Sequence, residues 1–145
     1  MYPKDQKRGF LTEMMISRES DYAIRIVRAL ADYGVKNVNE ICEKELVPVQ
    51  YAYKILRKLV KKGIVKSYRG VSGGYELAKD TEDINLFDVI IAIDEKFCIN
   101  DCLLPGYSCA RDKNSHCSVH TELIVIQNKL QKMLEEKSFF DILNT

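Results

Sequence analysis

A basic helical pattern followed directly by a glycine-rich hairpin pattern restricts the fold of this chain more than any other feature. After Pro48 the sequence reads VQYAYKILRKLVKKG, with apolar residues at three- and four-residue spacing. This spacing predicts an amphipathic helix over residues 49–62 that ends at Gly63. The next residues read IVKSYRGVSGGYELA, two short alternating strands around a glycine-rich turn. They predict a β-hairpin, so we expect a small sheet beside the helix.

Two shorter helical patterns precede this pair. Ser17 can cap a helix with a clear apolar stripe, and Gly34 is a suitable stop. A second helix fits residues 39–46 with Asn39 as its cap, and Cys42 lies on its apolar side, where we expect a core residue rather than a ligand. The second helix, a short turn and the basic helix together predict a helix-turn-helix. The expected fold is therefore mainly α with a small β wing.

The charge of the chain is unevenly distributed. The formal net charge is +1, but residues 48–79 contain eight Lys and Arg residues against Glu76 alone, which leaves about −6 for the rest. A basic block of this kind is typical of a phosphate-binding face, although charge alone fits a solvated helix face equally well. A basic second helix can enter the major groove of DNA, with the hairpin as a wing.

We therefore predict a DNA-binding surface on the basic helix and the wing. Its residues are Pro48, Gln50, Tyr51, Tyr53, Lys54, Arg57, Lys58, Lys66, Arg69, Ser72 and Gly73. Side chains early in the helix would choose bases, while most lysines would contact phosphate. The GVSGG turn is also a candidate nucleotide-binding loop, but neither a P-loop lysine nor Rossmann spacing accompanies it.

Four of the five cysteines lie between residues 98 and 118, which we call the cysteine segment. The spacing is Cys98-x3-Cys102-x6-Cys109-x7-Cys117-x2-His120, without the paired CxxC motifs of a zinc ribbon. No apolar run is long enough for a signal peptide or a membrane span, so we expect a cytoplasmic protein without membrane contact. In a reducing cytoplasm, crowded thiols indicate metal ligands or redox-active groups rather than disulfides.

The C-terminal part has the pattern of a pairing helix. Apolar residues recur at alternating four- and three-residue spacing: Val119, Leu123, Ile126, Leu130, Met133. This is typical of a coiled-coil seam and predicts a homodimer, with packing back on the winged helix as the alternative. Two basic helices about 34 Å apart would read a palindromic operator on double-stranded DNA. Ser138 can cap a final short helix.

The pattern divides the chain into five parts. We expect a flexible N-terminal extension (1–15), a winged helix-turn-helix domain (16–80), a connecting helix (81–97), the cysteine segment as sensor (98–118), and a dimerisation helix with a C-terminal helix (119–145).

Several segments resemble the Rrf2 family of winged-helix regulators. They are ISRESDYAIRIVRALA, LVPVQYAYKILRKLVKKGIVKSYRGVSGGYELA, INLFDVIIAID and the cysteine segment, and the most specific are RGVSGGYELA and Cys117-Ser-Val-His120. The similarity runs from about Ile16 to the C-terminus. It implies a winged helix-turn-helix with a long C-terminal dimerisation helix, regulation of transcription rather than enzymatic activity, and a homodimer.

The cluster-binding branches of that family imply an iron-sulfur cluster, most often 2Fe-2S, that senses iron-sulfur, redox or nitric oxide status. The matching ligands are Cys102, Cys109 and Cys117. His120 matches the fourth ligand of one branch, and Asp21 of the partner subunit matches that of another. Cys98 has no counterpart, but the longer spacings here leave it open as a substitute ligand.

Other interpretations of these residues stay open. His120 also fits a plain surface position, and Asp21 fits a favourable charge at a helix N-terminus. A cluster-free regulator would respond to a protein partner or to thiol oxidation, and a structural zinc site is a further variant. An enzyme with Cys117 as nucleophile and His120 as base is disfavoured, because the sequence offers no identifiable orienting acid or oxyanion site.

Overall fold

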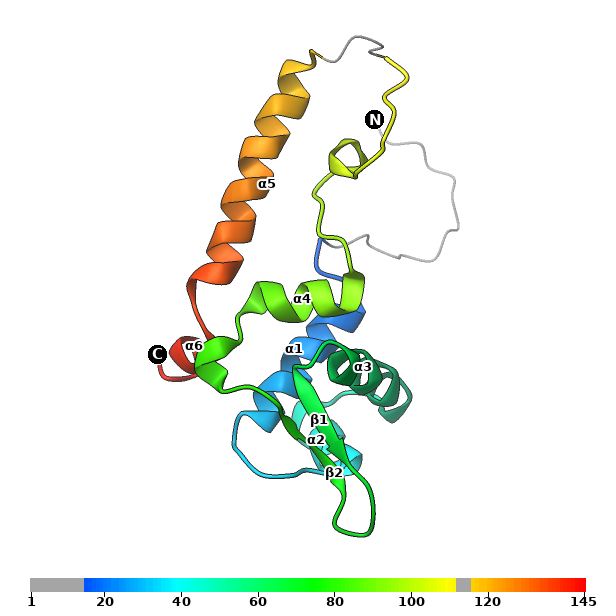
Figure 1. The fold of residues 1–145 in the computed structure, drawn as a ribbon, viewed down its shortest axis with the longest axis vertical. Helices are drawn as coiled ribbons and strands as arrows, with labels where there is room; N and C mark the ends of the chain where they lie inside the picture. Colours follow the sequence, from blue (N-terminus) through cyan, green and yellow to red (C-terminus); the bar gives the residue numbers. More distant parts are fainter. Residues whose placement is uncertain (1–14, 112–115) are drawn as a thin grey trace, which may run out of the picture.

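The computed structural model describes residues 15–111 and 116–145 and is mainly helical, with one small sheet (Figure 1). The elements are α1 (Arg18–Leu30), α2 (Val38–Glu45), α3 (Val49–Lys61), β1 (Val65–Tyr68), β2 (Gly74–Leu77), η1 (Thr81–Asp83), α4 (Leu86–Asp94), η2 (Asp101–Leu103), α5 (Ser118–Glu136) and α6 (Phe139–Leu143). The expected class, mainly α with a small β wing, is confirmed. Except for Met15, the predicted N-terminal extension lies outside the described residues, as do residues 112–115 of the cysteine segment.

Side-chain caps fix where the first two helices begin. Ser17 caps α1 as predicted, because its Oγ accepts a hydrogen bond from the backbone N–H of Ser20 at 3.0 Å. The prediction that Asn39 caps the second helix is wrong. Asn37 is the cap, since its side chain accepts from the N–H of Glu40 at 3.0 Å while the Glu40 carboxylate accepts from the N–H of Asn37 at 2.7 Å. This reciprocal pair needs a carboxylate or amide three residues after the cap, and Asn39 has Cys42 there.

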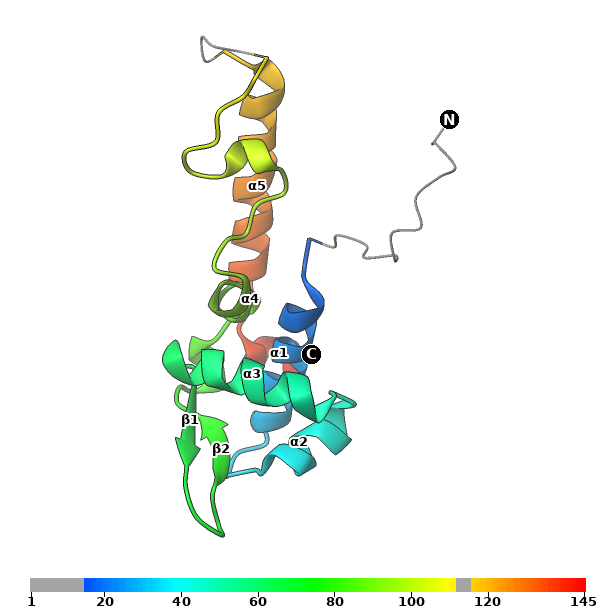
Figure 2. The ribbon, with the colours of Figure 1, turned by 90° about the vertical axis from the view of Figure 1, so that its right-hand side faces the viewer.

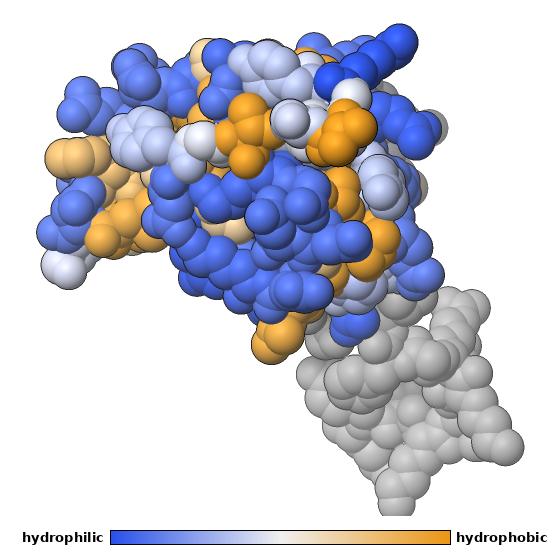
Figure 3. All heavy atoms as spheres, turned by 90° about the horizontal axis from the view of Figure 1, so that it is seen from below, coloured by the Kyte–Doolittle hydropathy of each residue, from blue (hydrophilic) through white to orange (hydrophobic). Residues whose placement is uncertain are grey.

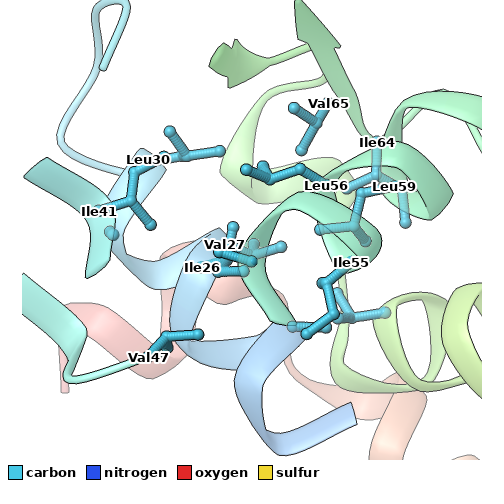
Figure 4. Close-up of a cluster of buried hydrophobic side chains, with 14 of the residues drawn as sticks. Ile26, Val27, Leu30, Ile41, Val47, Ile55, Leu56, Leu59, Ile64 and Val65 are labelled. Carbon is cyan, nitrogen blue, oxygen red and sulfur yellow. The ribbon is translucent and has the colours of Figure 1, made fainter. Parts of the chain in front are cut away.

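The hydrophobic core lies where α1, α2 and α3 meet, with β1 against it (Figure 4). Its fully buried side chains include Ile26, Val27, Leu30, Ile41, Ile55, Leu56, Leu59 and Val65. Cys42 belongs to this core, and burial raises the pKa of its thiol. The prediction that Cys42 is a core residue is therefore confirmed, and α3 is held with its apolar side inward.

The antiparallel hairpin is hydrogen-bonded to the segment between α1 and α2, which lies beside β2. Lys36 and Tyr75 exchange two backbone hydrogen bonds, of 2.9 and 2.8 Å. A Cβ at Gly74 would lie 2.4 Å from the carbonyl oxygen of Lys36, so only glycine allows this approach. The wing therefore has a set position beside α3 (Figure 2).

Helix α5 rises away from the helices and hairpin that surround the core, and residues 98–111 run alongside it (Figure 1). The apolar residues that the sequence predicts along one side of α5 fall into two groups. Leu123 and Leu130 are half-buried within the chain. Val119, Ile126 and Met133, seven residues apart, are exposed by 64%, 40% and 68%. We call these three residues the exposed stripe.

Beyond α5 the chain returns to the winged helix. Phe139, at the start of α6, is buried, and its backbone N–H donates to the carbonyl oxygen of Ile84 at 2.8 Å. Ser138 caps this helix as predicted, through a hydrogen bond from the N–H of Asp141 at 3.1 Å. The base of α5 is thereby attached to the DNA-binding part.

Candidate DNA-binding surface and cysteine segment

The outward side of α3 carries a row of polar residues that face solvent. Gln50, Tyr53, Arg57 and Lys61 recur at three- and four-residue spacing and are all exposed, and we call them the recognition face. Among the described residues, the side chains of Arg57 and Lys61 have no ion-pair or hydrogen-bond partner, so both charges are available to phosphate. Lys61 was absent from the predicted surface, although its position four residues after Arg57 could have indicated it.

Two of the predicted DNA-contacting lysines on α3 have partners within the chain. One carboxylate oxygen of Glu19 in α1 accepts a hydrogen bond from Lys54 Nζ at 2.5 Å, and the other accepts one from Lys58 Nζ at 3.2 Å. Lys58 also donates to the carbonyl oxygen of Ile93 at 3.1 Å. The Lys54 hydrogen bond is the main cause that lowers the pKa of Glu19. These lysines hold α3 against α1 and α4, so their contact with DNA stays a prediction.

The first turn of α3 is oriented by Pro48 and Tyr51. Pro48 is the residue before the helix, has an extended backbone and is exposed. The ring of Tyr51 packs against that of Tyr22, with centroids 5.6 Å apart. Tyr51 is therefore partly a packing residue between α3 and α1, while its remaining surface faces solvent.

The wing presents Arg69 and Ser72 at its exposed tip. At Gly73 a Cβ would lie 2.4 Å from the carbonyl oxygen of the last residue of β1, so the turn requires glycine there. Lys66 pairs with Glu76 across the hairpin at 3.1 Å, and this contact raises the pKa of Lys66. Seen from below, this side of the molecule is largely hydrophilic with scattered hydrophobic residues (Figure 3). Of the wing cations, Arg69 is thus the one without an intramolecular partner among the described residues.

The cysteines of the cysteine segment differ in exposure. All are free thiols, with Cys98 and Cys102 half-buried and Cys109 and Cys117 exposed. The Cys102 sulfur accepts a hydrogen bond from Asn100 Nδ2 at 3.2 Å. Two thiols are therefore held against the protein, and two are open to solvent.

Cys117 and His120 lie at the start of α5. Cys117 is the residue that precedes the helix, and its Sγ accepts from the backbone N–H of His120 at 3.4 Å. This contact uses the His120 backbone and leaves the imidazole side chain half-buried on the first turn.

Helix α5 fixes the beginning of the cysteine segment through one amide side chain. Gln127 Nε2 donates to the carbonyl oxygen of Phe97 at 2.7 Å, and its Oε1 accepts from the N–H of Ile99 at 2.9 Å. The two bonds flank Cys98, so the backbone of this cysteine is held in place from both sides.

The predicted ligands are not gathered within the chain. Outside residues 1–14 and 112–115, no group of three His, Cys, Asp or Glu side chains is placed to hold a metal ion. Asp21 forms an ion pair with Arg25 at 3.1 Å, and α1 is far from the start of α5 (Figure 1). The donor set itself, several thiols and an imidazole, has the chemistry that iron-sulfur clusters require.

None of the helices in the described parts of the chain combines the length and apolar character needed to cross a bilayer.

Comparison with known proteins places the chain among transcriptional regulators. Residues 16–145 match the Rrf2 family, which is described as an iron-dependent transcriptional regulator. The regulator NsrR of Oceanobacillus iheyensis is 27% identical over 139 residues, which cover 90% of each protein. The solved structure of IscR from T. potens superposes with a TM-score of 0.73 at 21% identity, covering 91% of this chain and 88% of that one. CymR, the global cysteine regulator of B. subtilis, gives a TM-score of 0.68 at 20% identity, covering 88% of this chain and 94% of that one. The chain belongs to the Rrf2 family of winged-helix transcriptional regulators.

Proposed function

We propose that this regulator binds a specific operator by placing α3 in the major groove and the wing tip against the adjacent phosphates or minor groove. The observation that carries the proposal is the recognition face, where Gln50 and Tyr53 can reach base edges while Arg57 and Lys61 have no side-chain partner within residues 15–111 and 116–145. Arg69 would make the corresponding contact from the wing. The protein would act in the cytoplasm, in contact with DNA and not with a membrane.

Arg57→Ala is expected to weaken binding to operator and to unrelated DNA by a similar factor, roughly fivefold at about 0.15 M salt, because one phosphate contact is lost. The slope of log K against log salt should fall by about one. Fluorescence anisotropy titrations over a series of salt concentrations measure both quantities.

Lys132→Ala is the matched control, since Lys132 is an exposed lysine on α5, away from the recognition face. It should leave DNA binding unchanged. Full affinity in a variant that combines Arg57→Ala, Lys61→Ala and Arg69→Ala would show that this surface does not bind DNA.

We further propose a homodimer that forms along the exposed stripe of α5. Apolar side chains at seven-residue spacing support this pairing, because such a row lies along one side of a helix and packs against its counterpart in a second helix. In a dimer, two α3 helices about 34 Å apart would match a palindromic operator.

The regulatory signal, in this proposal, is the state of the cysteine segment. Cys102, Cys109, Cys117 and His120 would hold an iron-sulfur cluster, with 2Fe-2S the expected type. Cys98 and Asp21 of the partner subunit are the alternative fourth ligands. Such a cluster would supply sensitivity to iron supply, oxidants or nitric oxide. The protein places Cys117 and His120 at the start of α5, and the segment that carries the other ligands begins shortly after the end of α4.

Protein purified without oxygen is expected to contain iron and acid-labile sulfide near two per chain, the content of a 2Fe-2S cluster. Serine in place of Cys102, Cys109 or Cys117 should abolish both, because each replacement removes a thiolate ligand. Cys42→Ala is the control, and its metal content should match the wild type because Cys42 is a core residue. Zinc in place of iron would instead indicate a structural zinc site.

A cluster-free regulator is the second candidate. It is favoured by two exposed thiols, Cys109 and Cys117, and by the absence of an assembled three-ligand group in the described residues. Such a protein would respond to thiol oxidation or to a regulatory protein partner. Metal-free protein after attempted reconstitution with iron and sulfide would select this candidate.

A further inference from the structure

The chain leaves the DNA-binding part at the end of α4, and the last residue there is bound to α1. One carboxylate oxygen of Asp94 accepts from Ser17 Oγ at 2.8 Å, and the other accepts from Ser20 Oγ at 2.7 Å. Ser20 is fully buried and Asp94 half-buried. Hydrogen bonds to an ionised carboxylate are stronger than neutral ones, so this contact fixes the end of α4 on the first turn of α1.

Helix α3 is bound to the same end of α4. Lys58 donates to the carbonyl oxygen of Ile93 at 3.1 Å and to Glu19 at 3.2 Å. An ammonium group is favoured at a helix C-terminus, where carbonyl oxygens lack helical partners and carry partial negative charge. Two consecutive residues, Ile93 and Asp94, thus connect α4 to α3 and to α1. We call this set of contacts the polar junction.

The polar junction lies directly before the cysteine segment. Glu95 has a left-handed backbone, with φ 55°, and turns the chain out of α4. Only residues 95–97 separate Asp94 from Cys98, whose flanking backbone groups are held by Gln127 of α5. This short linker is therefore bound at one end to α5 and at the other to α1 and α3.

We propose that Asp94 is a positioning residue that couples the cysteine segment to the recognition helix α3. A change at Cys98 or in the contacts of Gln127 would pull on the three-residue linker and displace the end of α4. Ser17 and Ser20 would transfer this displacement to α1, while Lys58 would transfer it to α3. The inference rests on the proposed function, because it assumes that the cysteine segment is the sensor.

Hydrogen exchange of full-length, metal-free protein tests this coupling. N-ethylmaleimide alters the cysteine segment directly, and a Cys42→Ala background confines the reaction to its four thiols. Exchange at the first turn of α1 and in α3 is expected to change severalfold after the treatment. In Asp94→Ala the treated and untreated proteins should be indistinguishable in these helices. A purely structural role would alter exchange equally in both forms and would leave the difference between them intact.

Asp88→Ala is the matched control, because Asp88 is a half-buried carboxylate at the other end of α4 that accepts a hydrogen bond from the backbone N–H of the Asn85 cap. It should keep the wild-type response. Ser20→Ala serves as a milder variant should Asp94→Ala fold poorly, since it removes one of the two hydroxyl contacts and should reduce the response in part.

A wild-type response that persists in Asp94→Ala and Ser20→Ala, or α1 and α3 helices that never respond in the wild type, would overturn the role of Asp94. DNA affinity, measured on the same samples, distinguishes this from failure of the proposed function. Affinity that ignores the treatment while exchange in α3 responds would contradict the sensing function and leave the coupling in place.

Discussion

Ile126→Glu is expected to convert the proposed dimer into a monomer and to lower operator affinity by roughly 10²-fold or more. Ile126 lies at the centre of the exposed stripe, between Val119 and Met133. In a pair of helices joined there, each new carboxylate would be moved from water into an apolar contact near its counterpart, so that both desolvation and like charge would oppose the pairing. Losing the pairing also removes the second recognition helix, whose tethered binding contributes about 10²- to 10⁴-fold. Sedimentation velocity and titration of a palindromic operator measure the two effects.

Asn128→Glu adds the same charge to the opposite side of α5, at another exposed position, and should leave both assembly and DNA binding unchanged. A dimer of normal stability in Ile126→Glu would place the interface elsewhere. Monomers in both variants would indicate that α5 tolerates no added charge, which would remove the argument for the exposed stripe.

Arg28→Met is expected to destabilise the folded protein by about 3 kcal/mol, because it leaves the buried carboxylate of Glu45 without its cation. The Glu45 side chain is only 6% exposed, and both of its oxygens accept from Arg28 Nε at 3.1 Å. The same contact raises the pKa of Arg28. Since Arg28 itself is 52% exposed, the expected value lies at the lower end for a broken buried pair. Urea unfolding should show a lower midpoint with an unchanged slope.

Lys44→Met is the control for this prediction. Lys44 pairs with Asp32, and both side chains are exposed, so removing this cation should cost less than about 1 kcal/mol. Equal losses of stability in the two variants would mean that burial of Glu45 does not determine the effect.

The local pattern of the sequence was sufficient to predict the elements of the winged helix. Apolar spacing located α3, the glycine-rich turn located the hairpin, and the hydroxyl of Ser17 located the start of α1. Each of these signals depends on residues within a few positions of one another. The predicted cap of the second helix, Asn39, is two residues too late, because the cap is fixed by the reciprocal hydrogen bonds of Asn37 and Glu40 and not by the residue type alone.

Contacts between distant residues could not be predicted in this way. Ser20 and Asp94 are 74 positions apart, and nothing in the sequence near either residue indicates that the two side chains are in contact. Lys58 was assigned to phosphate because a cation on a basic helix has no visible partner in the sequence, whereas the fold brings Glu19 and the end of α4 to it. The concentration of positive charge singled out α3, but net charge could not separate cations without a partner in the described residues from cations that are paired.

The α5 seam illustrates a different limit. A stripe of apolar residues shows that one side of a helix is covered, but not whether its own chain or a second copy covers it. Leu123 and Leu130 are half-buried within the chain, while Ile126 between them is exposed. Three-dimensional packing was needed to separate the residues that this chain itself covers from those that it leaves exposed.

Because the backbone N–H of Phe139 donates to the carbonyl oxygen of Ile84, α5 is attached to the rest of the fold just beyond its C-terminal end, and we take this attachment as the pivot of any rotation of the helix (Figure 1). A helix of 19 residues is about 28 Å long, so a rotation of about 10° at the pivot moves the far end, next to Cys117, by about 5 Å. Conversely, a displacement of about 5 Å at the far end corresponds to a rotation of only about 10° at the pivot. In the proposed dimer, a rearrangement of several ångströms around Cys117 would therefore change the angle between α5 and the winged helix by only a few degrees, and the two α3 helices would have to be aligned to within such angles to fit one face of a duplex.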